Sequence, residues 1–145
     1  MAWEPRFVVD LVAPDAGHGR HVANMAIDEI FYDTRNRYLR GLGVEDLWDR
    51  EVQPQIREAL IRFDSEAMPG DRLRCASWVV SRSCRAFVIE QTLASADGRM
   101  VATCRSVCVA VNTVHGGAAA LPDDLWAAVE AFEGRAISAA TTPGG

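Results

Sequence analysis

The sequence lacks lysine: its fifteen basic residues are all arginine, and twenty acidic residues give a formal net charge of −5. A nucleic-acid-binding domain usually presents a basic face, so this balance argues against that class of protein. No stretch approaches the roughly 18 apolar residues of a membrane-spanning helix. The N-terminal residues include acids and two prolines where a secretory signal would have an apolar run. We therefore expect a cytoplasmic protein that binds neither nucleic acid nor a membrane.

Cysteine is also scarce, and the four cysteines are Cys75, Cys84, Cys104 and Cys108. They lie in segments with a strand-like pattern. In a chain without a secretion signal, we interpret them as reduced, buried, small hydrophobic residues. Cys104, Cys108 and His115 do not have the spacing of zinc ligands, so we expect no metal site. With 145 residues and 49% hydrophobic content, the chain can form one domain whose core needs no disulfide.

The most informative stretch runs from Asp15 to Leu42. It begins as a loop with glycine, histidine and a carboxylate, and continues from about Ala23 as a helical pattern of about twenty residues, roughly 30 Å long. Apolar residues recur at three- and four-residue spacing and predict one buried face. The residues of this face are Ile27, Ile30, Phe31, Thr34, Tyr38 and Leu42. A helix of this length is expected at the centre of a small domain.

Strand-forming segments flank this helix, and the predicted strands are 6–12, 55–64, 72–82, 86–95 and 99–111. The segment 55–64 also fits a helix, but its alternation favours a strand. Asp97-Gly98 is typical of a hairpin turn, and Trp48 is expected to anchor the connection 44–54. A short helix follows Pro122, and residues 135–145 are expected to form a flexible tail after a domain of residues 1–134. This order predicts an α+β fold, with one antiparallel sheet around one long helix.

Three motifs follow one another through the chain. The acidic loop leads into HVAN (21–24), the helix continues as FYDTRNRYLRGLG (31–43), and PGDRL (69–73) precedes the long strands joined by DGRMVA (97–102). In this order and spacing they resemble motifs of hot-dog-fold acyl-CoA thioesterases of the 4-hydroxybenzoyl-CoA thioesterase type. The resemblance covers about residues 5–133. It implies a hot-dog fold and hydrolysis of an acyl or aroyl thioester to free acid and coenzyme A.

Asp15 is the candidate nucleophile or general base in this comparison. Aligning His21 and Asn24 without gaps would place Gly17 at the position of the family's acid, whereas a two-residue insertion in the loop restores Asp15. Ala23 stands where the family has the first of two asparagines. On the residues alone, Asp15 also fits a turn or capping acid after Pro14, which is a common role.

The remaining candidate catalytic residues are Asn24, His21 and Glu29. Asn24 could orient the substrate or water, or serve as the N-cap of the helix. His21, and less directly His18, could hydrogen-bond the thioester or the attacking water. Glu29 is the alternative acid, because some members of the family carry their carboxylate on this helix; it could also be a solvated helix residue.

The resemblance also suggests that Arg82, Ser83 and Arg85, between two strands, contact the nucleotide of coenzyme A. Coenzyme A is then part of the substrate, and no separate cofactor is expected. The family usually pairs its sheets across a dimer, so we expect a homodimer or homotetramer.

Two other functions compete with this one. The chain could release an acyl group from an acyl-carrier protein, or it could bind acyl thioesters without hydrolysing them, since its motif is altered at Ala13 and Ala23. A hot-dog dehydratase is disfavoured because the histidine–aspartate pairing of that class is missing from the central helix. No G-x-S-x-G motif occurs, which argues against a serine thioesterase of the α/β-hydrolase type.

Overall fold

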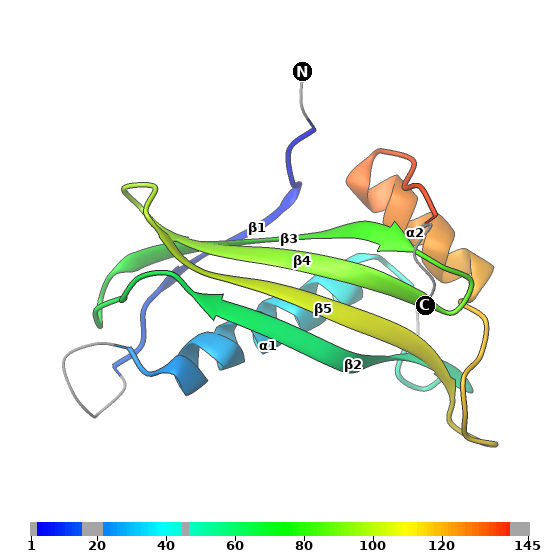
Figure 1. Cartoon of the computed structure of the whole chain (residues 1–145). Helices are drawn as coiled ribbons and strands as arrows, with labels where there is room; N and C mark the ends of the chain where they lie inside the picture. Colours follow the sequence, from blue (N-terminus) through cyan, green and yellow to red (C-terminus); the bar gives the residue numbers. More distant parts are fainter. Residues whose placement is uncertain (1–2, 16–21, 45–46, 140–145) are drawn as a thin grey trace.

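Five antiparallel strands form one sheet in the order β1-β3-β4-β5-β2, seen from one side in Figure 1. The computed structural model describes residues 3–15, 22–44 and 47–139. The elements are β1 (Phe7–Val12), α1 (Asn24–Gly41), β2 (Val52–Phe63), β3 (Arg72–Arg82), β4 (Ala86–Ser95), β5 (Met100–Asn112) and α2 (Asp123–Glu133). The α+β fold with an antiparallel sheet around a long helix is confirmed, and segment 55–64 belongs to a strand, as its alternation predicted. None of the helices in the described ranges is long and apolar enough to cross a membrane.

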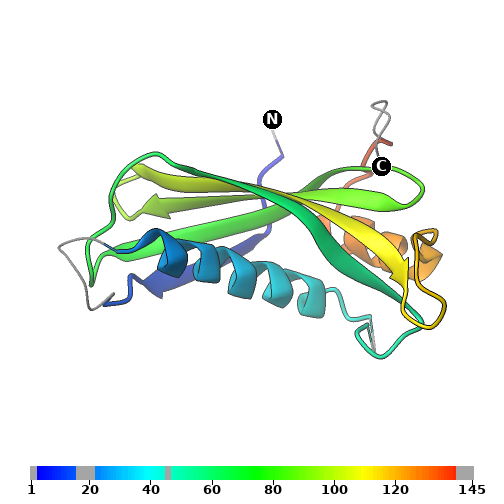
Figure 2. The same cartoon turned by 60° about the horizontal axis from the view of Figure 1, so that its bottom comes forward.

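Helix α1 lies lengthwise against one face of the sheet, which we call the inner face (Figure 2). Its predicted stripe is buried, apart from Ile30, which is only half-buried. Two further residues that the stripe did not include, Arg35 and Leu39, are also buried. The helix stops at Leu42, and Gly43 continues the chain at a φ of 75°, which glycine adopts without steric cost.

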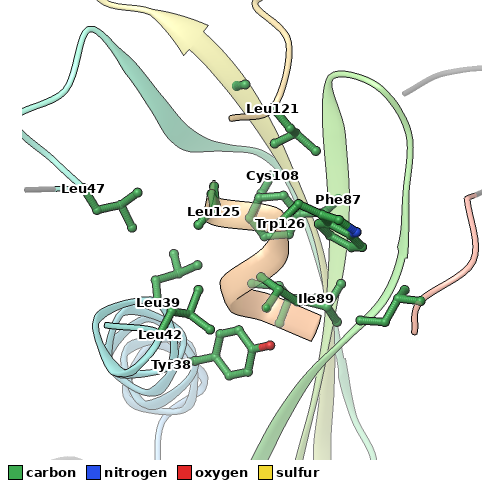
Figure 3. Close-up of a cluster of buried hydrophobic side chains, with 14 residues drawn as sticks. Tyr38, Leu39, Leu42, Leu47, Phe87, Ile89, Cys108, Leu121, Leu125 and Trp126 are labelled. Atoms are coloured by element: carbon green, nitrogen blue, oxygen red, sulfur yellow. The ribbon is translucent and has the colours of Figure 1, made fainter. Parts of the chain in front are cut away.

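Two apolar clusters occupy the space between the helices and the sheet. The first joins the C-terminal half of α1 to α2 and to the adjoining ends of the strands, and Figure 3 shows Tyr38, Leu39 and Trp126 among its members. The second surrounds the N-terminal half of α1 and includes Ile27 and Phe31. A layer of buried polar residues lies among these apolar residues, and it consists of Thr34, Arg35, Ser77, Gln91 and Ser106. We call this set the polar layer.

The polar layer fixes α1 on the sheet by hydrogen bonds. The Gln91 side-chain amide on β4 donates to the Phe31 carbonyl at 3.1 Å and to the Thr34 hydroxyl at 2.9 Å. It also donates to Ser77 on β3 at 3.0 Å. Apolar contacts are not directional, whereas a hydrogen bond requires a particular geometry. These bonds therefore set the position of α1 along the strands.

Two expectations about packing are corrected by the structure. Trp48 is 40% exposed, with Arg40 over its ring at 5.7 Å, and the buried anchor of that connection is Leu47. Cys84 is exposed because it lies in the turn after β3, whereas the other three cysteines are buried and reduced as predicted. Burial raises the pKa of the Cys75 thiol to about 11 and that of Cys108 to about 12. These two thiols therefore stay protonated and are poor nucleophiles.

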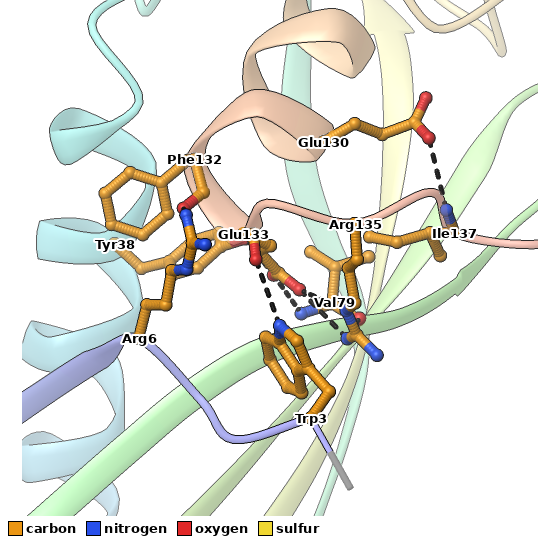
Figure 4. Close-up of polar contacts among 9 residues, drawn as sticks. All are labelled: Trp3, Arg6, Tyr38, Val79, Glu130, Phe132, Glu133, Arg135 and Ile137. Carbon is orange, nitrogen blue, oxygen red and sulfur yellow. Dashed lines mark hydrogen bonds and ion pairs between the residues drawn. The ribbon is translucent and has the colours of Figure 1, made fainter. Parts of the chain in front are cut away.

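The end of α2 is held by a buried carboxylate, Glu133 (Figure 4). It accepts hydrogen bonds from the Tyr38 hydroxyl of α1 and, at 2.7 Å, from the Val79 N–H of β3. Arg135 pairs with the same carboxylate at 2.9 Å and lies over the Trp3 ring at 3.6 Å. We call these five residues the Glu133 network. It joins both ends of the described chain to α1 and to the sheet.

The segment after α2 packs against the domain through residue 139. Ile137 is buried, and Ala139 forms a bridge with Arg82 at the end of β3. The flexible tail was expected to begin at 135, but residues 135–139 are held by these contacts. Residues 140–145 lie outside the described residues.

Candidate active site

The N-terminus of α1 is the first component of the site. The helix begins at Asn24, and Ala23 is its N-cap, without a side-chain cap hydrogen bond. Asn24 is therefore not the capping residue. No described residue accepts a hydrogen bond from the backbone N–H of Asn24 or Met25, and the first turn contains no acid. These N–H groups and the helix dipole together form a site of positive potential.

A cavity of about 290 Å³ opens beside this helix end. Its walls come from the helix entrance and from the segment that follows β2, and the lining residues are Val22, Asn24, Ile27, Phe63, Asp64, Ser65 and Glu66. Two of them, Asp64 and Glu66, are carboxylates that the sequence analysis did not select. Acids in a loop after a strand resemble any solvated turn, and no spacing in the sequence indicates that β2 ends beside Asn24.

The connection between β2 and β3 also holds both ends of the loop that carries Asp15. The Ala13 N–H donates to the Asp71 carbonyl at 2.8 Å, and the Gly70 N–H donates to the Ala13 carbonyl at 2.9 Å. At the other end of the loop, the Val22 N–H donates to the Ala67 carbonyl at 2.7 Å. The described ends of the loop therefore lie along one short turn.

Asp15 lies two residues beyond Ala13 and is exposed. The structure thus brings the chain segment that carries Asp15 to the same turn as the entrance of α1. The candidates His18 and His21, and the insertion inferred between Gly17 and Arg20, fall outside the described residues.

Glu29 does not join this group of residues. Each helical residue advances by about 100°, so Glu29 points roughly 140° away from Asn24 and roughly 160° away from Ile27. Asn24 and Ile27 both line the cavity, and Glu29 is exposed on the other side of α1. Of the two carboxylates that the sequence suggested, Glu29 lies away from the cavity, whereas the segment that carries Asp15 is hydrogen-bonded to the turn beside it.

The three candidate residues for coenzyme A lie at the opposite end of the sheet. The Arg82 guanidinium stacks over the Trp126 ring of α2 at 4.5 Å. The Ser83 hydroxyl accepts the Ala86 N–H at 3.2 Å and so closes the turn between β3 and β4, and Arg85 is exposed beside it. The run of β3 from Leu73 to Arg82 measures about 30 Å. One chain therefore does not bring these residues to the entrance of α1.

Strand β2 is an edge of the sheet, and most of it is exposed on both faces. Ile56 is 40% exposed, Leu60 59% and Phe63 45%. In an isolated protein, an apolar edge strand of this length invites pairing with another strand. Helix α1 packs on β3 and β4 and leaves the inner face of β2 largely uncovered.

A metal site is not evident in the part of the chain that the structure describes. None of its histidine, cysteine, aspartate and glutamate side chains gather in groups of three or more that could hold an ion. The polar groups that the described residues bring to the entrance of α1 are the Asn24 amide, the Ser65 hydroxyl, carboxylates and backbone N–H groups.

Comparison with known proteins gives a consistent result. A family model described as "Thioesterase-like superfamily" matches residues 10–129. A hypothetical protein from Staphylococcus aureus, solved in complex with CoA, has a TM-score of 0.83 at 17% identity, over 99% of this chain and 92% of that one. A 1,4-dihydroxy-2-naphthoyl-CoA thioesterase from Synechocystis has a TM-score of 0.75 at 17% identity, over 85% and 94%.

A third solved structure is a thioesterase from Thermus thermophilus complexed with coenzyme A and Zn. It has a TM-score of 0.76 at 18% identity, over 90% of this chain and 96% of that one. At these identities the three structures establish the fold. No curated protein sequence matches the chain significantly.

Proposed function

Because the chain belongs to the thioesterase-like superfamily, we propose that it hydrolyses an acyl or aroyl thioester of coenzyme A to the free acid and coenzyme A. The observation that carries this proposal is the N-terminus of α1, whose first N–H groups have no acceptor among the described residues and which lies beside a cavity lined by Asn24. The segment that carries Asp15 is hydrogen-bonded to the same turn. Two solved structures with this fold contain coenzyme A, and several are named thioesterases.

The proposed chemistry uses few groups. The N–H groups of Asn24 and Met25 polarise the thioester carbonyl and stabilise the oxyanion that develops on it. The Asp15 carboxylate acts as a general base that takes a proton from water, and the water oxygen bonds to the thioester carbon. The carbon–sulfur bond then breaks and coenzyme A leaves as its thiolate, and the protonated Asp15 returns its proton to the thiolate or to solvent. Neither step requires a further cofactor.

The direct test is thiol release from a panel of acyl-CoA and aroyl-CoA thioesters by the purified wild-type protein. We expect saturable release with at least one member of the panel, well above the rate of spontaneous hydrolysis. Presenting the same acyl group on an acyl-carrier protein distinguishes the two possible thioester donors. Tight acyl-CoA binding by calorimetry without thiol release would contradict the proposal and favour a non-catalytic binding protein.

We further propose that the active form is a homodimer joined at β2. If two β2 strands pair antiparallel about a twofold axis through Leu60, Glu58 of each copy faces Arg62 of the other. Glu58, Leu60 and Arg62 alternate on the outer face of the strand and are all exposed. This register places opposite charges on both sides of a central leucine pair, which is favourable in antiparallel sheets. The second copy would also cover the inner face of β2 beside the cavity.

A charge-reversal pair tests this register. Arg62→Glu places two carboxylates opposite each other on both sides of the axis, so we expect the dissociation constant of the dimer to rise by about tenfold or more. The double variant Glu58→Arg/Arg62→Glu restores opposite charges and is expected to restore the dimer. Light scattering after size-exclusion chromatography measures the molar mass of the single and the double variant, and it distinguishes a dimer from a tetramer.

Arg72→Glu serves as the matched control, because Arg72 is an exposed arginine of the same sheet, on β3, away from this edge. A dimer that tolerates Arg62→Glu as well as Arg72→Glu would exclude the proposed register. A double variant that stays monomeric would do the same.

A further inference from the structure

Arg35 is an unusual arginine for this protein. It lies in the middle of α1, is only 6% exposed, and donates one hydrogen bond, from Nη1 to the Ser106 hydroxyl of β5 at 3.1 Å. Its guanidinium lies over the Tyr32 ring at 5.9 Å. Its Nε is fully buried without a partner, and no described carboxylate pairs with it. Of the five guanidinium donors, one donates to Ser106, and the Nε–H is buried without an acceptor.

The other arginines show what this one lacks. Exposed arginines pair with carboxylates, as Arg74 does with Asp10 at 2.8 Å and Arg105 with Glu90 at 2.8 Å. Such exposed pairs contribute little to stability, because water already solvates both charges. A buried guanidinium cannot lose its proton, and burying it without an anion is costly. Arg35 is therefore a buried cation that an anionic ligand would stabilise.

The surroundings of Arg35 indicate where the anion would come from. Ser106, which accepts the hydrogen bond from Arg35, pairs in register with Ala59 of β2, and Ala59 is exposed. The Nη2 atom makes no hydrogen bond with a described residue and is not among the fully buried unpartnered atoms, so it keeps contact with solvent. The hydrogen bond to Ser106 thus places the guanidinium beside the part of β5 that pairs with the exposed Ala59 of β2.

This position is in line with the cavity at the entrance of α1. Phe63 lines that cavity, and Phe63 and Ala59 lie on the same inner face of β2, about 13 Å apart along the strand. Along α1, Asn24 and Arg35 are separated by about 16 Å, and helical side chains point back toward the N-terminus. Both elements therefore place the guanidinium roughly 12 Å from the cavity.

We infer that Arg35 is a specificity-determining residue that binds the distal carboxylate of an acidic acyl group of medium length. This inference rests on the proposed function, because it assumes that the thioester lies at the entrance of α1. A carboxylate would give the guanidinium a charge-assisted pair and would supply the anion that the chain itself does not provide. The preferred substrate class is then an ω-carboxyacyl thioester of coenzyme A.

The test compares two thioesters of equal chain length, suberoyl-CoA and octanoyl-CoA, with the wild type and Arg35→Met. We expect the wild type to prefer suberoyl-CoA. In Arg35→Met, kcat/KM for suberoyl-CoA is expected to fall by about 10- to 100-fold, because an uncompensated carboxylate would then be buried, while that for octanoyl-CoA changes by less than about threefold. Arg35→Lys, which keeps a cation, should retain part of the preference.

Arg37→Met is the matched control, since Arg37 lies on the same helix, is exposed and pairs with Asp33. It should leave the preference unchanged. A wild type that hydrolyses both thioesters equally, or an Arg35→Met variant that loses both activities in proportion, overturns the inference and leaves the proposed function intact.

If no thioester is hydrolysed, the proposed function fails, and calorimetric binding of free suberate decides the inference separately. Binding by the wild type that is lost in Arg35→Met supports it. Equal binding, or no binding by either, overturns it.

Discussion

A Glu133→Ala variant is expected to lose about 4 kcal/mol of unfolding free energy, because two buried donors lose their acceptor at roughly 1–3 kcal/mol each. Glu133 is 1% exposed, and its carboxylate accepts from the Tyr38 hydroxyl and the Val79 N–H, both of which are completely buried. Alanine has no acceptor, and neither donor can reach water. In a domain of this size such a loss lowers Tm by roughly 10 °C, measurable by calorimetry.

Arg135 contributes less to this expected loss. Its side chain is 28% exposed, so its guanidinium can turn toward water when the carboxylate is removed. Tyr38 is different, because burial and then the hydrogen bond to Glu133 raise the pKa of its hydroxyl well above the ordinary value. The hydroxyl therefore stays a proton donor and requires an acceptor in the folded state.

Two controls separate the Glu133 network from the general cost of changing α2. Glu130→Ala removes the same residue type one turn earlier on the same helix. Among the described residues, the Glu130 carboxylate accepts one hydrogen bond, from the Ile137 N–H at 3.1 Å. We expect a loss of about 1 kcal/mol there, and a similar loss for Tyr38→Phe, which leaves Glu133 its other partners. A Glu133→Ala variant no less stable than Glu130→Ala would show that the network does not hold α2.

Local patterns predicted the elements of this fold because most of them have one buried face, with β2, largely exposed on both faces, as the exception. Alternation identified β2, and the three- and four-residue spacing identified most of the buried face of α1. The same rule missed Leu39, because α1 contacts α2 as well as the sheet and therefore buries a wider stripe than a helix that packs on one surface. It also missed Arg35, because a charged residue in a helix is expected to face water.

The site was less predictable than the fold because it is assembled from distant segments. The pairing of β2 with β5 decides that Asp64 lies beside Asn24, and no local pattern carries that information. Arg82 and Arg85 were selected because arginine suits the phosphates of a nucleotide. In one chain, β3 places them at the end of the sheet away from the entrance of α1. Residue types indicate which side chains could take part in the reaction. Which of them lie close together depends on the long-range pairing of the strands.

Several carboxylates near α1 are candidates for the catalytic acid, and substitutions distinguish them. Asp15→Asn is expected to lower kcat/KM for the best acyl-CoA substrate by about 10²- to 10⁴-fold, the usual contribution of a general base. Asparagine has the same shape but cannot take a proton from water. Measuring Tm beside the kinetics of the variant separates a loss of chemistry from a loss of stability.

Three matched variants complete this experiment: Asp64→Asn and Glu66→Gln at the cavity, and Glu29→Gln on the other side of α1. Each keeps the shape of its side chain and removes only the charge. We expect Glu29→Gln to have wild-type kinetics, and the two cavity variants to change KM more than kcat, because they border the bound substrate. Full activity in Asp15→Asn, together with a large loss in Asp64→Asn, would move the general base to the segment after β2. It would make Asp15 the turn acid that its position after Pro14 also allows.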